Sequence, residues 1–229
     1  NITITGYSVA GGDGFPKAAV NCFNLEGNQS AADYFSGKLK IGQPVAEAGT
    51  NPKPARKLSA AEEKVFRLGR EIYFRDAHCA TCHQADGRGA EMPKEPGKPA
   101  RGAYPPLGRT PGYPSNGWLE GDPDRVIKIV LNGLYGVQTI DGKTYGDAAS
   151  GQPVMTGLGQ LLNDEEVAAV LTYVRQSFGN NLPAVKPAQV KKVREAIKGK
   201  NNALYTVEEV LKEHPLGVPA KVEPVKKKK

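Results

Sequence analysis

The sequence predicts an all-α fold, in which three to four core helices occupy the middle of the chain, residues 56–183. Two stretches, residues 60–75 and 164–178, repeat apolar residues at helical spacing. Each follows a capping box, in which two side chains satisfy the free backbone amides at a helix start. A shorter apolar run at residues 125–132 follows an aspartate and a proline, which are preferred where a helix begins.

The first expected helix, residues 60–75, begins at the capping box of Ser59 and Glu62. Two adjoining apolar rows run along it, and Gly69 lies in its interior. A glycine inside a helix costs up to about 1 kcal/mol relative to alanine. We therefore interpret Gly69 as a point where another helix approaches closely.

The middle and last core helices are separated by a less regular stretch. After the helix at residues 125–132, an Asp-Gly pair at the centre of residues 137–145 predicts a small hairpin or a loop excursion. The last core helix begins at the capping box of Asn163 and Glu166 and runs to Gly179. It is the most regular helical pattern in the chain.

Residues 1–55 form an irregular N-terminal extension in this interpretation, because they show few apolar residues and no sustained period. We expect this extension to wrap the core or to dock on a partner. It contains Cys22, which is either buried as a small hydrophobe or paired between chains. The sequence starts at Asn1 without a leader, and we expect an exported, periplasmic protein whose leader is absent from this chain.

Residues 184–229 form a basic C-terminal extension. They hold twelve Lys/Arg against five Asp/Glu, which accounts for the whole net charge of +7, whereas the rest of the chain is neutral. Residues 187–198 and 206–213 predict two short helices. The run Lys226–Lys229 predicts a solvated tail.

Residues His78–His83 contain a C-x-x-C-H pattern, which is typical of covalent haem attachment. On one helical turn, Cys79, Cys82 and His83 share a face. The two thiols could form thioethers with the vinyl groups of one porphyrin, and the imidazole could bind its iron. The predicted cofactor is one haem c.

Two other uses of a C-x-x-C pair are weaker. A closed zinc site needs four ligands, and only Cys22, His78 and His214 remain, at no familiar spacing. A thioredoxin-like pair would lie beside a βαβ pattern, which the sequence does not show. We interpret His78 as a neighbour of the haem edge and His214 as a surface residue.

Few side chains are candidates for the far side of the haem. The chain has two methionines, and Met92 lies nine residues after His83 in a loop rich in Gly and Pro. We predict that Met155 binds the iron, because a loop that closes over the far face must come from a distant part of the chain. Met92 is then exposed or fills a gap. Trp118 and Tyr113 either line the pocket and bond a haem propionate or simply pack.

The stretch from Ser59 to Gly179 resembles a class I cytochrome c domain. A helix enters Cys-Ala-Thr-Cys-His, and a Pro-Pro-Leu loop, a middle helix, a methionine loop and a last helix follow. The segments Gly-Asp-Pro-Asp-Arg-Val-Ile from Gly121 and Leu-Leu-Asn-Asp-Glu-Glu from Leu161 are similar to periplasmic bacterial cytochromes that serve dehydrogenases and oxidases. This resemblance implies the cytochrome c fold around a single haem.

The resemblance also implies roles for further residues. The carbonyl of Pro105 would accept the N–H of the His83 imidazole, and Gly69 would cross Tyr173. Relatives have Met-Pro-Pro-Met where this chain has Met-Thr-Gly-Leu from Met155. The predicted ligand is therefore kept, while the prolines that would stiffen its loop are lost.

We predict a His/Met-ligated electron carrier and not an enzyme, because no Ser/His/Asp set, carboxylate pair or phosphate loop accompanies the motif. A second hypothesis makes the chain the electron-transfer subunit of a dehydrogenase or oxidase complex, attached through its extensions. The basic tail would steer it to an acidic partner protein or an anionic membrane surface, or would only aid solubility. The alternative is a small haem enzyme, peroxidase-like or gas-binding, whose Met155 is displaced. We expect no nucleic-acid partner.

Overall fold

The computed structural model describes residues 54, 56–93, 96–97, 100–108, 117–140 and 142–217. The described residues belong to one compact unit of the chain. Cys22, Tyr113 and the Lys226–Lys229 run lie outside the described residues, so the expectations for them stay predictions. None of the helices in the described ranges is both long and apolar enough to cross a bilayer.

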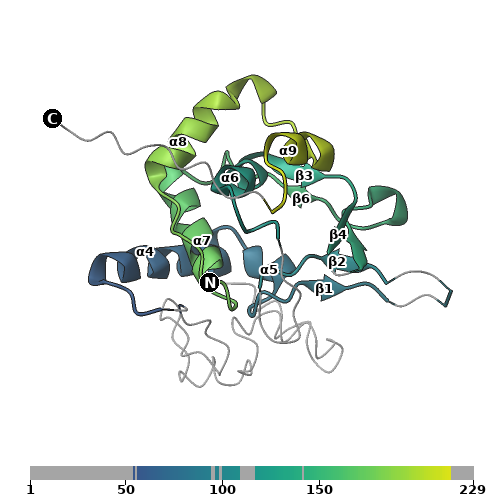
Figure 1. The fold of residues 1–229 in the computed structure, drawn as a ribbon, viewed down its shortest axis with the longest axis horizontal. Helices are drawn as coiled ribbons and strands as arrows, with labels where there is room; N and C mark the ends of the chain where they lie inside the picture. The colour runs from purple at the N-terminus through teal and green to yellow at the C-terminus, as the bar shows by residue number, and fades with distance from the viewer. Residues whose placement is uncertain are drawn as a thin grey trace, which may run out of the picture. The chain divides into compact units, whose positions relative to one another are not determined.

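Helices form most of the regular structure (Figure 1). They are α4 (Ala60–Glu71), the π-helical turn η2 (Ile72–Asp76), α5 (Cys79–His83), α6 (Pro123–Asn132), the short turn η3 (Ala148–Ser150), α7 (Asp164–Gln176), α8 (Pro187–Ala196), the short turn η4 (Lys198–Lys200) and α9 (Val207–Glu213). The strands are β1 (Ala90–Glu91), β2 (Gly102–Tyr104), β3 (Gly133–Tyr135), β4 (Gln138–Ile140), β5 (Lys143–Tyr145), β6 (Met155–Thr156) and β7 (Tyr205–Thr206). Both predicted capping boxes of the core helices are formed, at Ser59 and at Asn163.

Helices α4 and α7 cross at Gly69 (Figure 1). A Cβ atom at Gly69 would lie 2.0 Å from the carbonyl oxygen of Ala169 and 2.8 Å from the Cβ of Tyr173. Only a residue without a side chain permits this approach, as the interior glycine predicted. The ring of Phe66 lies 5.0 Å from that of Tyr173 between centroids, so aromatic contacts surround the crossing.

The first helix widens before it reaches the C-x-x-C-H motif. The amide of Ala77 donates to the carbonyl of Ile72 at 2.9 Å, five residues back, which defines a π turn. Ile72 and Tyr73 are fully buried in this turn. His78 follows with a left-handed backbone, φ 52°, and helix α5 begins after it. The single helix expected over residues 60–75 is thus a regular helix that ends in a π turn.

Short strands accompany the helical core, so the label all-α leaves out part of the fold. Strands β1 and β2 pair antiparallel, and β4 and β5 form a hairpin, the first of the two alternatives predicted over residues 137–145. A third sheet has the order β6-β3-β7, with β6 antiparallel and β7 parallel to β3. Segments of two or three residues are too short to show the alternation that identifies a strand in a sequence.

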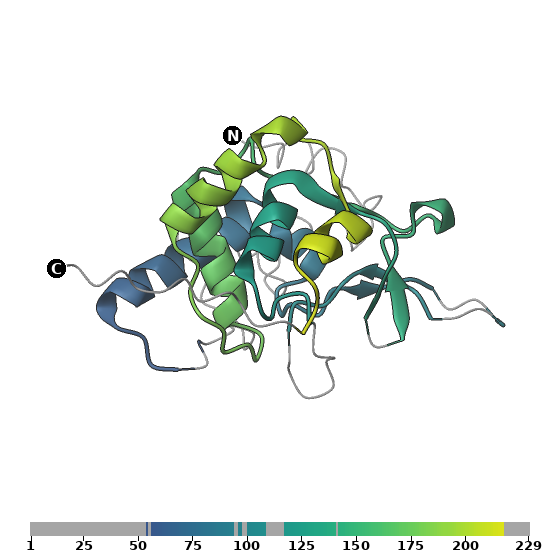
Figure 2. The same ribbon diagram turned by 45° about the horizontal axis from the view of Figure 1, so that its top comes forward.

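The described part of the C-terminal extension packs on the core (Figure 2). Val190 and Val193 on α8 are buried in the same hydrophobic cluster as the residues of α4, α6 and α7. Tyr205 and Val210 join a second cluster with residues of α6 and β3. Residues 187–213 therefore add two helices and one strand to the folded unit.

Candidate functional site

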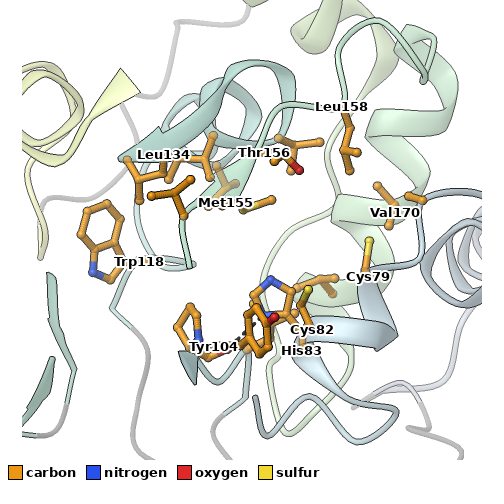
Figure 3. Close-up of a pocket in the computed structure, with 18 of the residues that line it drawn as sticks. Cys79, Cys82, His83, Tyr104, Trp118, Leu134, Met155, Thr156, Leu158 and Val170 are labelled. Carbon is orange, nitrogen blue, oxygen red and sulfur yellow. Dashed lines mark hydrogen bonds between the residues drawn. The ribbon is translucent and has the colours of Figure 1, made fainter. Parts of the chain in front are cut away.

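An apolar cavity lies between α5, the end of α6 and the segment around β6 (Figure 3). Its lining includes Tyr73, Cys79, Cys82, His83, Tyr104, Pro105, Leu107, Trp118, Leu119, Val126, Ile129, Val130, Leu134, Met155, Leu158, Val170, Leu171 and Val174. Figure 3 shows His83 and Met155 on opposite sides of the open space, with Cys79 and Cys82 beside His83. Apolar walls with a histidine and a methionine, two residue types that can bind a metal, facing each other suit a flat, largely hydrophobic group that carries a metal at its centre.

Helix α5 and the loop after it position His83. Its Nδ1 lies 2.9 Å from the carbonyl oxygen of Pro105, the contact that the resemblance implied. Because Nδ1 donates that hydrogen bond, Nε2 keeps its lone pair. Burial lowers the pKa of His83 below its ordinary value, while the hydrogen bond to Pro105 acts in the opposite direction. The imidazole is therefore neutral at neutral pH, which is the form that binds a metal.

Two glycines bring the chain back under His83. The amide of Gly89 donates to the carbonyl of His83 at 3.0 Å, and the amide of Leu107 donates to the carbonyl of Gly87 at 2.7 Å. Gly89 has φ +68°, and a Cβ atom there would lie 2.1 Å from the carbonyl oxygen of Tyr104. These contacts place Pro105 against the imidazole although 22 residues separate it from His83.

Cys79 and Cys82 lie on the cavity side of α5 (Figure 3). Burial raises the pKa of the Cys79 thiol to about 12, and the adjacent Cys82 adds to the shift. A raised pKa disfavours the thiolate, which is the form that thiol exchange requires. In the described residues, no group of three or more His, Cys, Asp or Glu is placed to hold a metal ion.

Met155 enters the cavity from β6, opposite His83 (Figure 3). Its strand pairs with β3, where Met155 faces Leu134 in the register. The following residues fold onto the end of α6, since the amides of Leu158 and Gly159 donate to carbonyls of that helix at 2.8 and 2.9 Å. Met92 does not line the cavity, and its amide donates to the carbonyl of Arg101 at 3.1 Å.

Trp118 lines the cavity and is 6 % exposed. Its carbonyl accepts a hydrogen bond of 3.0 Å from Nε of the fully buried Arg125, which fixes this part of the wall. Tyr113, the other aromatic residue predicted here, lies outside the described residues. His78 lines the cavity next to Cys79, as expected for a neighbour of the haem edge.

His214 is not the surface residue that the sequence suggested. Its side chain is only 11 % exposed, and its Nδ1 lies 2.7 Å from a carboxylate oxygen of Asp122. The histidine follows α9, and Asp122 is the N-cap of α6, 92 residues earlier. The sequence shows only that His214 precedes a proline, which does not indicate a contact with a residue 92 positions earlier.

The sequence prediction missed one residue of the cavity wall, Tyr104, and one buried residue near it, Gln152. Tyr104, next to Pro105, lines the cavity at the end of β2 (Figure 3). Gln152 is buried, and its amide donates to the carbonyls of Gly102 at 3.0 Å and Thr144 at 2.7 Å, which ties β2 to β5. A polar residue three positions before the predicted ligand was a signal for such a contact, but its partners lie in distant strands.

Comparisons with known proteins agree with this geometry. The family model for cytochrome c matches residues 66–178. Cytochrome c-552 of Thermus thermophilus is 33 % identical over 132 residues, which cover 55 % of this chain and 83 % of that protein. The fructose dehydrogenase cytochrome subunit of Gluconobacter japonicus is 35 % identical over 170 residues, which cover 74 % of this chain but only 29 % of that protein. The cytochrome c subunit of the quinone alcohol dehydrogenase of Gluconobacter oxydans is 28 % identical over 127 residues, with 55 % of this chain and 22 % of that protein covered.

Three observations lead to one conclusion. The C-x-x-C-H helix lines an apolar cavity, the family model matches, and the chain is similar to cytochrome c-552. Covalent attachment of haem c in this family uses the two cysteines of the motif, and this chain has Cys79 and Cys82 in place. The chain belongs to the cytochrome c family, as a class I c-type cytochrome with covalently attached haem c and a role in electron transfer.

Proposed function

We propose that this chain transfers single electrons and that His83 and Met155 would both bind the iron of its haem. The observation that carries this proposal is the entry of both side chains into one apolar cavity from opposite sides (Figure 3). When bound, haem c supplies an iron that alternates between the ferric and ferrous states. Cys79 and Cys82 would hold the porphyrin covalently.

The residues around the two ligands would keep both of them in place through many redox cycles. The Pro105 carbonyl orients the imidazole and keeps the proton on Nδ1. The wall residues Trp118 and Leu134 are both largely buried and exclude water from the cavity. A thioether ligand and a dry surrounding both favour the ferrous state, which raises the reduction potential.

We further propose that the chain is the electron-transfer subunit of a periplasmic dehydrogenase complex and has no catalytic activity of its own. Two relatives are named cytochrome subunits of dehydrogenases, and one of them aligns with 74 % of this chain, well beyond the residues that the family model matches. Substrate oxidation would then take place in a partner subunit. The Lys-rich end of the chain would bind an acidic surface of that partner or an anionic membrane.

The two methionines provide a matched test of the ligation. In the ferric holoprotein, a methionine–iron bond gives a weak far-red absorption band. We expect Met155→Ala to abolish this band and to make the ferric iron high-spin, because Met155 is the one thioether among the described residues that line the cavity. Met92→Ala should leave the band unchanged, because Met92 lies outside the cavity lining.

The same spectra distinguish the proposed electron carrier from the alternative hypothesis, a small haem enzyme. A wild-type ferric protein that is already high-spin, or a far-red band that survives in Met155→Ala, would contradict His/Met ligation. The subunit role needs a different measurement, which is purification from the source with partners intact. Elution as a 24.4 kDa monomer without a companion chain would count against it.

A further inference from the structure

We propose that the described part of the C-terminal extension is a brace that positions Met155 on the iron. The brace comprises residues 187–215, and the methionine loop comprises residues 155–163. The inference rests on the proposed ligation by Met155 and adds the element that maintains it. Arg194 is the central positioning residue, because its side chain joins the brace directly to the methionine loop.

The methionine loop has little rigidity of its own. It contains Gly157 and Gly159 and no proline. A Cβ atom at Gly157 would lie 2.5 Å from the carbonyl carbon of Asn132, and one at Gly159 would lie 2.6 Å from the carbonyl oxygen of Leu131. The glycines allow close packing on the end of α6, but glycine also leaves the backbone many alternative conformations. A stable position of Met155 therefore needs contacts from outside the loop.

Arg194 supplies three such contacts from helix α8. Its guanidinium donates to the carbonyl of Gly159 at 2.6 Å, to the carbonyl of Leu162 at 2.8 Å and to the carboxylate of Asp164 at 2.7 Å. One planar group thus spans the second half of the methionine loop and the first residue of α7. Hydrogen bonds with a charged donor are stronger than neutral ones, and the fixed fork of arginine holds the three acceptors in one geometry.

The strand beside β3 adds a second link. Leu134 faces Met155 on one side in the register and Tyr205 of β7 on the other. Just before β3, the side-chain amide of Asn132 donates to the carbonyl of Ala203 at 3.0 Å. The brace therefore fixes the strand to which the ligand strand is paired.

The far end of the brace is anchored independently of the methionine loop. Arg125 donates to the carbonyls of His214 and Pro215, both at 2.9 Å, and His214 contacts Asp122. Lys128 forms a salt bridge with Glu213. Arg125 and Lys128 lie on α6 and Asp122 is its N-cap, so the start of α6 is fixed to the end of the brace, while Asn132 at its other end bonds to Ala203 just before β7.

The test is the rate at which imidazole replaces the methionine ligand in the ferric full-length holoprotein. Arg194→Ala removes three hydrogen bonds to the loop, and we expect imidazole to bind about tenfold faster or more. The pH at which the far-red band disappears should also fall. Arg75→Ala is the matched control, because Arg75 makes a two-bond contact with the exposed Asp76 in η2, away from the loop. Its imidazole rate should equal that of the wild type.

A second variant tests whether a general loss of stability explains the result for Arg194→Ala. Asn132→Ala cuts the other link and should raise the imidazole rate to a smaller extent, because a single neutral hydrogen bond is lost. If Arg194→Ala lowers the melting temperature but leaves the imidazole rate at the Arg75→Ala value, the residue is only structural and the inference is wrong. A wild-type protein without a methionine–iron band would instead overturn the proposed ligation, so the two failures are distinct.

Discussion

The two sides of the cavity are held in different ways. His83 lies on a five-residue helix next to both cysteines, and its hydrogen-bond acceptor is 22 residues away. Met155 lies on a two-residue strand, and the contacts that the brace makes with its loop and with the end of α6 span 30 to 71 residues. Local contacts cost little loop-closure entropy, whereas long-range contacts form only when the whole domain is folded. We therefore expect the Met155 side to open first and the His83 side last.

Loss of Arg125 should have the largest effect on stability, since Arg125 connects Trp118 of the cavity wall to the end of the brace at His214 and Pro215. Its guanidinium contacts five carbonyl groups, including those of Trp118 and Pro215, and it is fully buried. Arg125→Met should lower the free energy of unfolding by about 3–5 kcal/mol, because several buried acceptors lose their donor. Denaturant unfolding of the holoprotein measures this change.

The exposed Arg67→Met is the control for that experiment and should change stability by less than about 0.5 kcal/mol. The variant Arg125→Lys separates charge from hydrogen bonding. It should still be destabilised but should keep the wild-type reduction potential, whereas Arg125→Met loses a buried positive charge that favours ferrous iron and should have a lower potential. Equal potentials in Arg125→Met and the wild type would contradict this electrostatic role.

Gly133 gives the next largest effect, confined to the Met155 side. It has φ +87°, and a Cβ atom there would lie 2.4 Å from the carbonyl oxygen of Met155. Gly133→Ala should cost about 2–3 kcal/mol of stability and weaken the far-red band, because β6 must move away from β3. Absorption spectra taken during denaturant unfolding report both quantities.

Gly142→Ala is the matched control for Gly133→Ala. Gly142 also has a positive φ, +71°, but nothing lies within 4 Å of its Cβ position. Gly142→Ala should lower the free energy of unfolding by about 1 kcal/mol, because alanine is strained at a positive φ. The far-red band should be unchanged. If both variants weakened the band equally, backbone strain and not contact with Met155 would be the cause.

The smallest expected effect is a pH dependence at Asp122, where the brace meets α6. Burial acts to raise the pKa of Asp122, but hydrogen bonds from the Asp124 amide and the His214 ring outweigh it, so the pKa is lowered. Because the pKa is lowered in the folded protein, ionised Asp122 stabilises the fold at pH values above the unfolded pKa of about 3.9. This stabilisation is lost as the pH falls through the pKa of the folded protein. Asp122→Asn should cost about 1 kcal/mol at pH 7, because asparagine keeps the N-cap but loses the negative charge at the start of α6.

Urea unfolding at neutral and at acidic pH checks this sign. The difference between wild type and Asp122→Asn should shrink in acid, where both side chains are neutral. Glu71→Gln, which changes an exposed carboxylate at the end of α4, should show no comparable pH-dependent difference. A difference at Asp122 that stays constant from neutral to acidic pH would show that the charge of Asp122 is not involved.

Much of the helical core could be predicted from the sequence, because its signals are local. The capping residues Ser59 and Asn163 mark helix starts through contacts three residues away, and Gly69 marks a crossing because only glycine fits there. The π turn at Ile72–Asp76 has no such signal. Tyr73 in this turn packs against Tyr173 and Phe178, whose ring centroids lie 5.4 and 5.5 Å from its own, and both partners are about 100 residues away in the chain.

The sequence alone therefore determined the haem attachment site, since Cys79, Cys82 and His83 lie within one helical turn and their chemistry follows from that spacing. The tertiary structure decided how the opposite side is built. It placed Met155 across the cavity and turned an apparent C-terminal extension into the support of its loop, through Arg194 and the strand at Tyr205. Such contacts join residues that are far apart in the chain and that belong to no sequence motif. They can therefore be identified only when the fold brings the residues together.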